Sequence, residues 1–128
     1  VVSSNENATI VIDLNKIGRY QVDANGNIVI EPQWSLTEHT ISSGGTMTYF
    51  PDGVSLNRGQ KVTFKADFDI SISWELRYSG AGYNSVVATG SGKSINKSFN
   101  MPADGTYKFH LKNNSSETVT VKSGSITY

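Results

Sequence analysis

The amino-acid sequence predicts an all-β fold, an antiparallel β-sandwich or jelly roll of about eight to ten short strands. Apolar and polar residues alternate with a period of two along most of the chain, and no stretch shows the apolar stripe of a helix. Gly, Asn, Asp and Pro interrupt this alternation at short intervals, as the turns of sandwiches do. With 128 residues, of which 37% are apolar, the chain fits a single domain spanning residues 1–128.

The first elements are a strand and a hairpin. The first strand is expected over residues 7–14, with one apolar face made of Ala8, Ile10, Ile12 and Leu14. Strands at 20–22 and 28–30 form a hairpin, because an Asn-Gly pair between apolar runs is a strong hairpin signal. Pro32 ends this hairpin or places it at an edge, since proline cannot donate to a ladder.

The segment 33–45 has no clear period and ends in a flexible turn at 42–45. A short strand at 47–50 precedes a turn at 51–53. This part of the chain is where the sequence pattern constrains the fold least.

The centre of the chain carries the clearest alternation, which predicts two half-buried strands at 62–68 and 70–78. A glycine-rich loop at 79–84 follows. Two further strands are expected at 86–88 and 95–99, with a Gly-Ser-Gly turn between them.

The last elements are strands at 107–111 and 119–121, joined by a turn at 113–116, and a bulge at Gly124. The alternation assigns one face of the central and last strands to the core. The predicted core consists of Val62, Phe64, Phe68, Ile72, Trp74, Leu76, Tyr107, Phe109, Leu111, Val119 and Val121.

One family resemblance rests on these later strands. The run GTYKFHLKNNSS from Gly105, followed by Val119-Thr120-Val121, resembles the closing hairpin of pre-peptidase C-terminal-type modules. The runs GQKVTF from Gly59 and WELRY from Trp74 are similar to the preceding strands of those modules. The resemblance covers residues 56–128 and implies a non-catalytic β-sandwich domain that accompanies secreted bacterial proteins, with no functional residues to transfer.

Composition excludes several classes of function. The 11 basic and 11 acidic residues balance, so no positive field is available for nucleic acid. The absence of cysteine excludes a disulfide scaffold, a thiolate zinc site and a thiol nucleophile. No window approaches the ~18 apolar residues of a membrane span.

Low charge and abundant hydroxyl and amide side chains favour a secreted, extracellular protein of bacterial origin. Charged residues make up 17% of the chain, and Ser, Thr and Asn together make up roughly three residues in ten. The chain opens on Val1 rather than Met, which is compatible with removal of a signal peptide or with trimming of a longer sequence.

Neither histidine has the surroundings of a catalytic base, so the sequence predicts no enzymatic activity. His110 alternates with Lys108 and Lys112 on a polar strand face. His39 precedes Ser42 without a nucleophile elbow or any ordered spacing. Both histidines are expected to be solvated.

One loop offers oxygen ligands at alternate positions, as calcium loops do: Asp23, Asn25 and Asn27. Glu31 is the nearest carboxylate that could complete such a site. A plain hairpin turn explains the same residues and is the favoured interpretation. Asp67 and Asp69 form a weaker second candidate, and the sequence predicts no cofactor apart from this weak calcium possibility.

The candidate ligand-binding residues are three aromatic side chains expected at the surface, Trp34, Tyr49 and Tyr83, together with Asn84. Exposed aromatic rings can stack on sugar rings, and loops on a rigid scaffold commonly carry binding sites. The alternation instead places Trp74 in the core.

These observations predict a secreted, non-catalytic binding or surface-interaction module whose partner is a protein or a polysaccharide at the cell surface. Three alternatives stay open. The chain could be a carbohydrate-binding module that uses the exposed aromatics, or a secreted inhibitor or toxin-like effector acting through residues 80–83. It could also be a self-assembling structural subunit that adds strands through an exposed edge. A small hydrolase is the least favoured class.

Overall fold

The structure of the protein is a computed structural model that describes residues 9–30 and 38–128. Nine strands lie in this part of the chain, which confirms the predicted all-β fold. In chain order the elements are β1 (Val11–Asp13), the 3₁₀ turn η1 (Leu14–Lys16), β2 (Arg19–Val22), β3 (Ile28–Ile30), β4 (His39–Ile41), β5 (Thr46–Leu56), β6 (Lys61–Gly80), β7 (Tyr83–Asn100), β8 (Gly105–Asn113) and β9 (Val119–Thr127). No helix among the described residues is long and apolar enough to cross a lipid bilayer.

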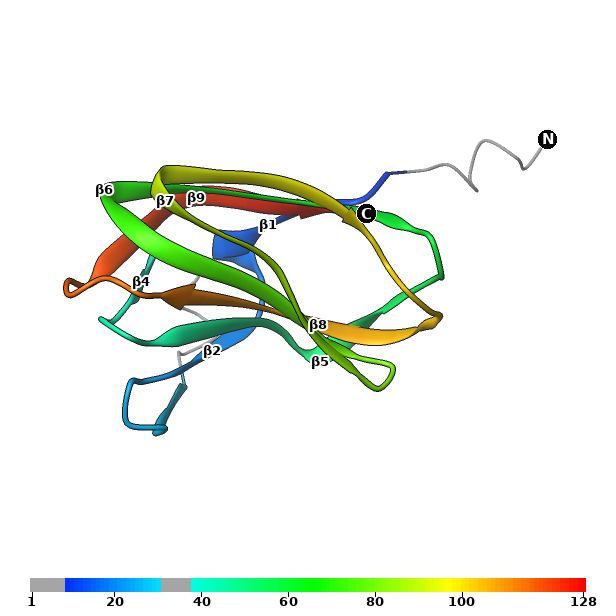
Figure 1. Cartoon of the computed structure of the whole chain (residues 1–128), viewed down its shortest axis with the longest axis horizontal. Helices are drawn as coiled ribbons and strands as arrows, with labels where there is room; N and C mark the ends of the chain where they lie inside the picture. The colour runs from blue at the N-terminus through cyan, green and yellow to red at the C-terminus, as the bar shows by residue number, and fades with distance from the viewer. Residues whose placement is uncertain (1–8, 31–37) are drawn as a thin grey trace.

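The strands form two layers, and the β6–β7 hairpin runs through both of them (Figure 1). The first half of β6 pairs with β9, which pairs in turn with β1 and β4; we call this the β9 layer. The second half of β6 pairs with β8, and the ladder continues through β5 and β2 to β3; we call this the β8 layer. β7 follows β6 over both halves. All pairings are antiparallel, so both layers can alternate between an inner apolar face and an outer polar face.

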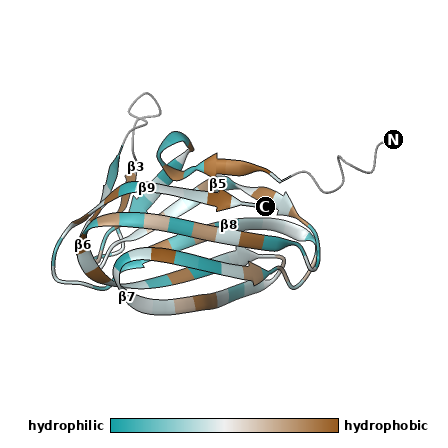
Figure 2. Cartoon of the chain, turned by 90° about the horizontal axis from the view of Figure 1, so that it is seen from above, coloured by the Kyte–Doolittle hydropathy of each residue, from teal (hydrophilic) through white to brown (hydrophobic). Residues whose placement is uncertain are grey.

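The core lies between the two layers and contains every predicted core residue. Their exposed fractions are at most 6%. Apolar and polar residues alternate along β6, as the colours in Figure 2 show, because one face of the strand packs inward and the other faces out. The period of two in the sequence therefore identifies which residues of each strand face the core between the layers.

The central strands are longer than predicted. The two strands expected at 62–68 and 70–78 are one strand, β6, whose register shifts between Asp67 and Ile72. At this shift the strand passes from the β9 layer to the β8 layer, and Ile70 is only half-buried. The strands expected at 86–88 and 95–99 are likewise both parts of β7.

A bulge replaces the turn predicted at 51–53. β5 continues through this segment, and its register with β8 shifts between Tyr49 and Val54. Phe50 has a φ of 59°, and its ring contacts that of Phe109 edge-on at 6.2 Å between centroids. The extra residues of a bulge break the alternation locally, which is why the sequence pattern resembles a turn.

The first strand covers Val11–Asp13 and not the predicted 7–14, of which residues 7 and 8 lie outside the described residues. Its last residue, Asp13, accepts a hydrogen bond from the Asn15 amide at 2.9 Å and so starts the 3₁₀ turn. The turn directs Leu14 into the core, where it packs at Gly124; a Cβ at Gly124 would meet both the Leu14 side chain and the Lys65 carbonyl oxygen. Gly124 thus permits close packing and is not the predicted bulge.

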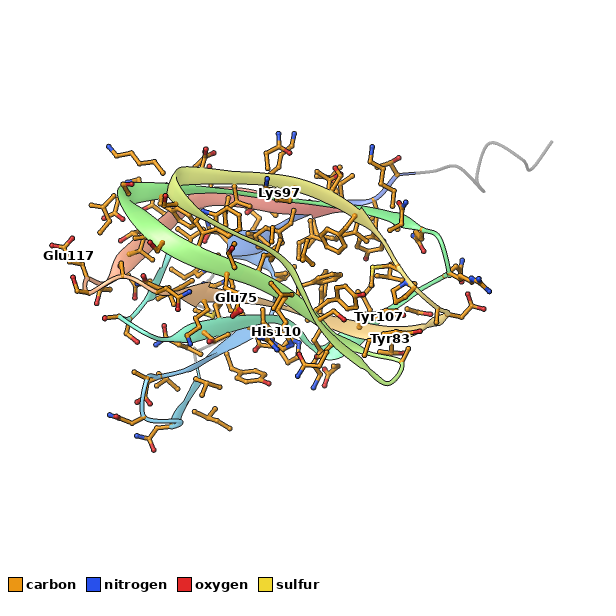
Figure 3. The ribbon with its side chains drawn as sticks, viewed as in Figure 1. Glu75, Tyr83, Lys97, Tyr107, His110 and Glu117 are labelled. Atoms are coloured by element: carbon orange, nitrogen blue, oxygen red, sulfur yellow. The ribbon has the colours of Figure 1, made fainter. Side chains whose placement is uncertain are left out.

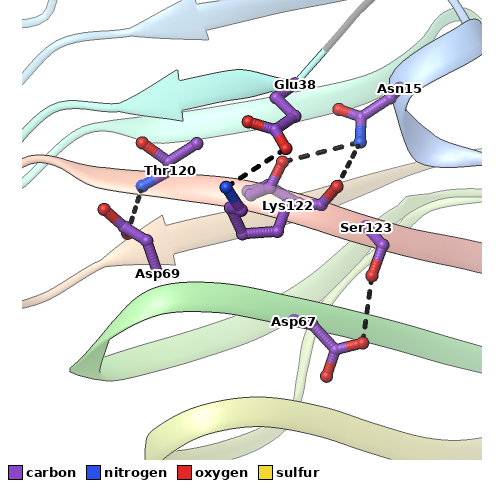
Figure 4. Close-up of polar contacts among 8 residues, drawn as sticks. Asn15, Glu38, Asp67, Asp69, Thr120, Lys122 and Ser123 are labelled. Atoms are coloured by element: carbon purple, nitrogen blue, oxygen red, sulfur yellow. Dashed lines mark hydrogen bonds and ion pairs between the residues drawn. The ribbon is translucent and has the colours of Figure 1, made fainter.

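The bulge in β9 lies at Lys122, because Asp67 pairs with Ser123 whereas Phe68 pairs with Val121. Figure 4 shows how the neighbouring strands hold this segment. The Ser123 hydroxyl donates to Asp67 at 3.0 Å, and the Thr120 amide donates to Asp69 at 2.8 Å. Lys122 itself pairs with Glu38 at 3.3 Å. The two aspartates named as a weak calcium candidate therefore bind groups of β9.

Candidate functional site

The outer face of the β8 layer carries an open groove of about 480 Å³. The groove is lined by Tyr20, Val22, Thr46, Thr48, Glu75, Arg77, Ser79, Asn84, His110 and Lys112. Most of these side chains alternate along their strands with buried ones; on β8, for example, His110 lies between Phe109 and Leu111. Because successive side chains of a strand point to opposite faces, burial of the core residues directs the lining residues outward.

Antiparallel register places the lining residues in two rows across the strands. One row runs Tyr20, Thr48, His110 and Arg77, and the other runs Val22, Thr46, Lys112 and Glu75. Residues directly opposite each other in such pairs have Cβ atoms about 4.5–5.5 Å apart. Four segments that are distant in sequence thereby contribute to one continuous surface.

His110 lines the groove and links three strands through polar contacts of its ring. Its Nδ1 lies 2.9 Å from the Thr48 hydroxyl on β5, and its Nε2 lies 2.8 Å from the Ser79 hydroxyl on β6. Burial lowers the pKa of His110, and the charges of Arg77 and Lys108 lower it further. The ring is therefore neutral near pH 7, with one donor and one acceptor nitrogen for the two hydroxyls. His110 is half-buried and its ring is held by these two hydroxyls, whereas the sequence predicts a solvated side chain (Figure 3).

Arg77 is held in place by two neighbours. Its Nη2 forms an ion pair with Glu75 at 3.3 Å, and its Nη1 donates to the Asn84 side-chain oxygen at 2.9 Å. The carboxylate of Glu75 is thus already paired. Lys112 lies opposite Glu75 in the register, yet its ammonium makes no hydrogen bond or ion pair with another described residue.

Tyr49 is not an exposed ligand-binding residue, so that prediction is wrong. It is 0% exposed, and its hydroxyl lies 2.7 Å from His39 Nε2. His39, expected to be solvated, is 3% exposed and has its Nδ1 2.6 Å from the Asn15 side-chain oxygen. Both side chains belong to a buried polar cluster that joins β4, β5 and the 3₁₀ turn, because Met47 and Tyr49 point to the same inner face of β5.

Two of the other candidates, Tyr83 and Asn84, do not share one site. Asn84 lines the groove, whereas Tyr83 lies near Tyr107 at the end of the sandwich (Figure 3). Tyr83 is 43% exposed, as predicted, and it follows a two-residue turn, Ala81-Gly82, whose φ values of 51° and 82° are those of a type I′ hairpin. The predicted loop 79–84 is therefore a tight turn. Trp34 lies outside the described residues.

The loop from Asp23 to Asn27 is a hairpin turn. The Asp23 carboxylate accepts the amides of Asn25 and Asn27, each at 2.9 Å, and the Asn27 amide in particular holds the pKa of Asp23 below its usual value. Among the residues that the structure describes, no three His, Cys, Asp or Glu side chains gather as metal ligands would. Glu31 lies outside them, so calcium binding stays an untested prediction.

The groove contains residues that the sequence analysis did not select: Tyr20, Glu75, Arg77, His110 and Lys112. A signal for four of them was present, since they occupy the polar positions of β6 and β8 opposite the predicted core. A polar strand face is usually plain solvated surface. The pairing of β8 between β5 and β6 is what turns this face into a groove, and it is a long-range property.

Neither a family model nor a curated protein sequence matches this chain. The likeness to pre-peptidase C-terminal-type modules is therefore untested. Solved structures do match in fold.

Carbohydrate-binding modules are among the matching structures, as three examples show. The C-terminal CBM6 of the laminarinase LamC from Zobellia galactanivorans aligns over 94% of this chain and 100% of its own, with 14% identity and a TM-score of 0.53. The carbohydrate-binding module CBM6cm-2 of Cellvibrio mixtus lichenase 5A, in complex with cellotriose, aligns over 93% and 96%, with 16% identity and a TM-score of 0.52.

The third structure is the CBM22-1–GH10 portion of xylanase 10B from Clostridium thermocellum, complexed with xylohexaose. It aligns over 94% of this chain with 11% identity and a TM-score of 0.59, and the chain spans only 28% of its length. At such identities the matches establish a shared β-sandwich fold.

Proposed function

We propose that this protein is a secreted polysaccharide-binding module that holds a sugar chain in the groove of the β8 layer. The observation that carries the proposal is the groove itself: an open surface across several strands, rich in hydroxyl, amide and charged side chains. Binding sites of this kind combine a few placed polar groups with an apolar or aromatic wall. The shared fold with carbohydrate-binding modules supports the same function.

Tyr20 supplies the aromatic wall in this proposal. It is half-buried on β2, lines the groove, and its hydroxyl makes no hydrogen bond with another described residue. An aromatic ring packs well against the CH face of a sugar, and its hydroxyl can bond to a sugar hydroxyl. Thr46 and Asn84, which also line the groove, offer further partners for sugar hydroxyls.

Assembly through a free sheet edge is less well supported. β7 is 18 residues long and pairs with β6 alone among the described strands, so it is a potential site of strand addition. However, it carries the exposed lysines Lys93 and Lys97, and charged side chains on an edge oppose strand addition. The groove therefore remains the better candidate for function.

Replacing Tyr20 with alanine is expected to weaken polysaccharide binding by about 1–3 kcal/mol, the usual loss for a central aromatic contact. Tyr20→Phe should retain most of the affinity because the ring remains. Affinity electrophoresis through gels that contain xylan, mixed-linkage glucan, soluble cellulose derivatives or acidic polysaccharides would identify a ligand, and calorimetry would give the affinities.

The matched control is Tyr83→Ala, which removes an equally large exposed ring outside the groove. Its affinity should equal that of the native protein, and its stability should change by less than about 1 kcal/mol, as for most surface changes. A greater loss of affinity from Tyr83→Ala than from Tyr20→Ala would place binding at the end of the sandwich. A native protein that binds none of these polysaccharides would contradict the proposed function.

A further inference from the structure

The charged groups around the groove do not balance, although the whole chain does. Arg77 and Lys112 line it, and Lys108 lies one step along the same face of β8, near enough to lower the pKa of His110. The only carboxylate among the lining residues is that of Glu75. Because the chain carries 11 basic and 11 acidic residues, this excess of positive charge is a local feature.

The carboxylate of Glu75 already forms an ion pair. Glu75 pairs with Arg77 at 3.3 Å, and its side chain is only 20% exposed. Lys112 is the residue opposite Glu75 in the register, yet its ammonium forms no ion pair with Glu75 or any other described residue. A half-buried cation with no partner gains more from an incoming anion than a fully solvated one does.

The other groups beside Lys112 add no negative charge. His110 is two residues away on the same strand face, and its ring nitrogens face Thr48 and Ser79. Thr46, the neighbour on β5, is neutral. An anionic ligand group near Lys112 would therefore meet one free ammonium, the outer N–H groups of Arg77 and neutral hydroxyls.

From this charge distribution we infer that the groove selects an acidic polysaccharide, one whose sugar units carry a carboxylate or sulfate group that binds Lys112. The inference rests on the proposed function, since it specifies the sugar that the groove would hold. Tyr20 and the neutral polar side chains would bind the sugar rings and hydroxyls. Lys112, assisted by Arg77, would discriminate a charged sugar from a neutral one.

The test uses ligand pairs that have the same sugar backbone, with and without its anionic groups. Polygalacturonate, alginate and glucuronoxylan are compared with their methyl-esterified forms, and dextran sulfate is compared with dextran. The native protein is expected to prefer at least one acidic polymer by about tenfold over its neutral counterpart. The preference should shrink as NaCl rises from about 20 mM to about 0.5 M, because salt screens the contact. The carboxylate and sulfate pairs show which anion is bound.

The matched variants are Lys112→Gln and Lys97→Gln. Lys97 is an exposed lysine of the same charge on β7, far from the groove (Figure 3). Lys112→Gln should abolish the preference for the acidic polymer while keeping any affinity for its neutral counterpart, and Lys97→Gln should leave the preference intact. An equal loss in both variants would mean general charge attraction and would overturn the inference.

Two further outcomes separate this inference from the proposed function. Binding of neutral polysaccharides with no effect of esterification, and no effect of Lys112→Gln, would overturn the acidic ligand and leave the polysaccharide-binding module in place. Absence of binding to every polymer in the panel would overturn both.

Discussion

Replacing Trp74 with alanine is expected to lower the free energy of unfolding by about 3–5 kcal/mol, a large share of the stability of a typical domain. Trp74 is 4% exposed and lies where β6 enters the β8 layer, opposite Asn113 on one side and Gly90 on the other. The truncation would leave a cavity that the strand ladders on both sides prevent from collapsing. Urea unfolding followed by circular dichroism measures the loss.

Trp74→Phe is the conservative control and should cost clearly less. The indole Nε1 has no hydrogen-bond partner among the described residues, so its removal breaks no bond, and a benzene ring fills most of the space. A loss below about 1 kcal/mol for the alanine variant would contradict the burial of this ring.

A second test probes the contact between Trp74 and Gly90. A Cβ added at Gly90 would lie 2.7 Å from the indole Cζ2, so Gly90→Ala should destabilise the native protein. The same change should cost much less in the Trp74→Ala background, because the clashing ring is gone. A double-mutant cycle without this coupling would mean that the indole does not cover Gly90.

The burial of Trp74 could be predicted from sequence because it follows from alternation alone. Trp74 shares a strand face with Ile72 and Leu76, and the same rule correctly assigned the core residues of β8 and β9. What alternation does not specify is whether a chain turns or bends. β6 continues past Asp67 because β7 pairs with it on both sides of the register shift, and this partner lies elsewhere in the sequence.

Tyr49 shows a second limit. Its alternation with Met47 indicates an inner face, but the bulge beginning at Phe50 disrupts the pattern immediately afterwards.

The groove shows a third limit. Glu75, His110 and Lys112 each occupy an ordinary polar position on their own strand, and only the pairing of β8 between β5 and β6 brings them together. The sequence therefore predicts which residues face outward, whereas the fold determines which of them form a site.

The buried cluster around His39 makes the stability of the protein depend on pH. Burial lowers the pKa of His39 to about 3, and the charge of Arg19 acts in the same direction. The hydrogen-bond geometry agrees with a neutral ring: Nδ1 donates to the Asn15 oxygen, and Nε2 accepts from the Tyr49 hydroxyl. The Asn15 amide nitrogen in turn donates to carbonyls of β9, the nearer at 3.3 Å. Protonating this ring would place a positive charge in the buried cluster, where Arg19 already carries one.

Lowering the pH from 7 to 5 is therefore expected to reduce the free energy of unfolding by about 2 kcal/mol through His39 alone. Below about pH 6.5 the unfolded chain takes up a proton on this imidazole, whereas the folded protein does not until about pH 3. Stability is thus lost progressively as the pH falls through this window. Urea unfolding at a series of pH values measures the slope, and His39→Gln, although less stable at pH 7, should show a clearly shallower slope.

His110→Gln is the comparison for a half-buried histidine whose pKa is also lowered, and it should flatten the slope less. Equal slopes in the native protein and His39→Gln would mean that this imidazole titrates in the folded state as it does in the unfolded chain.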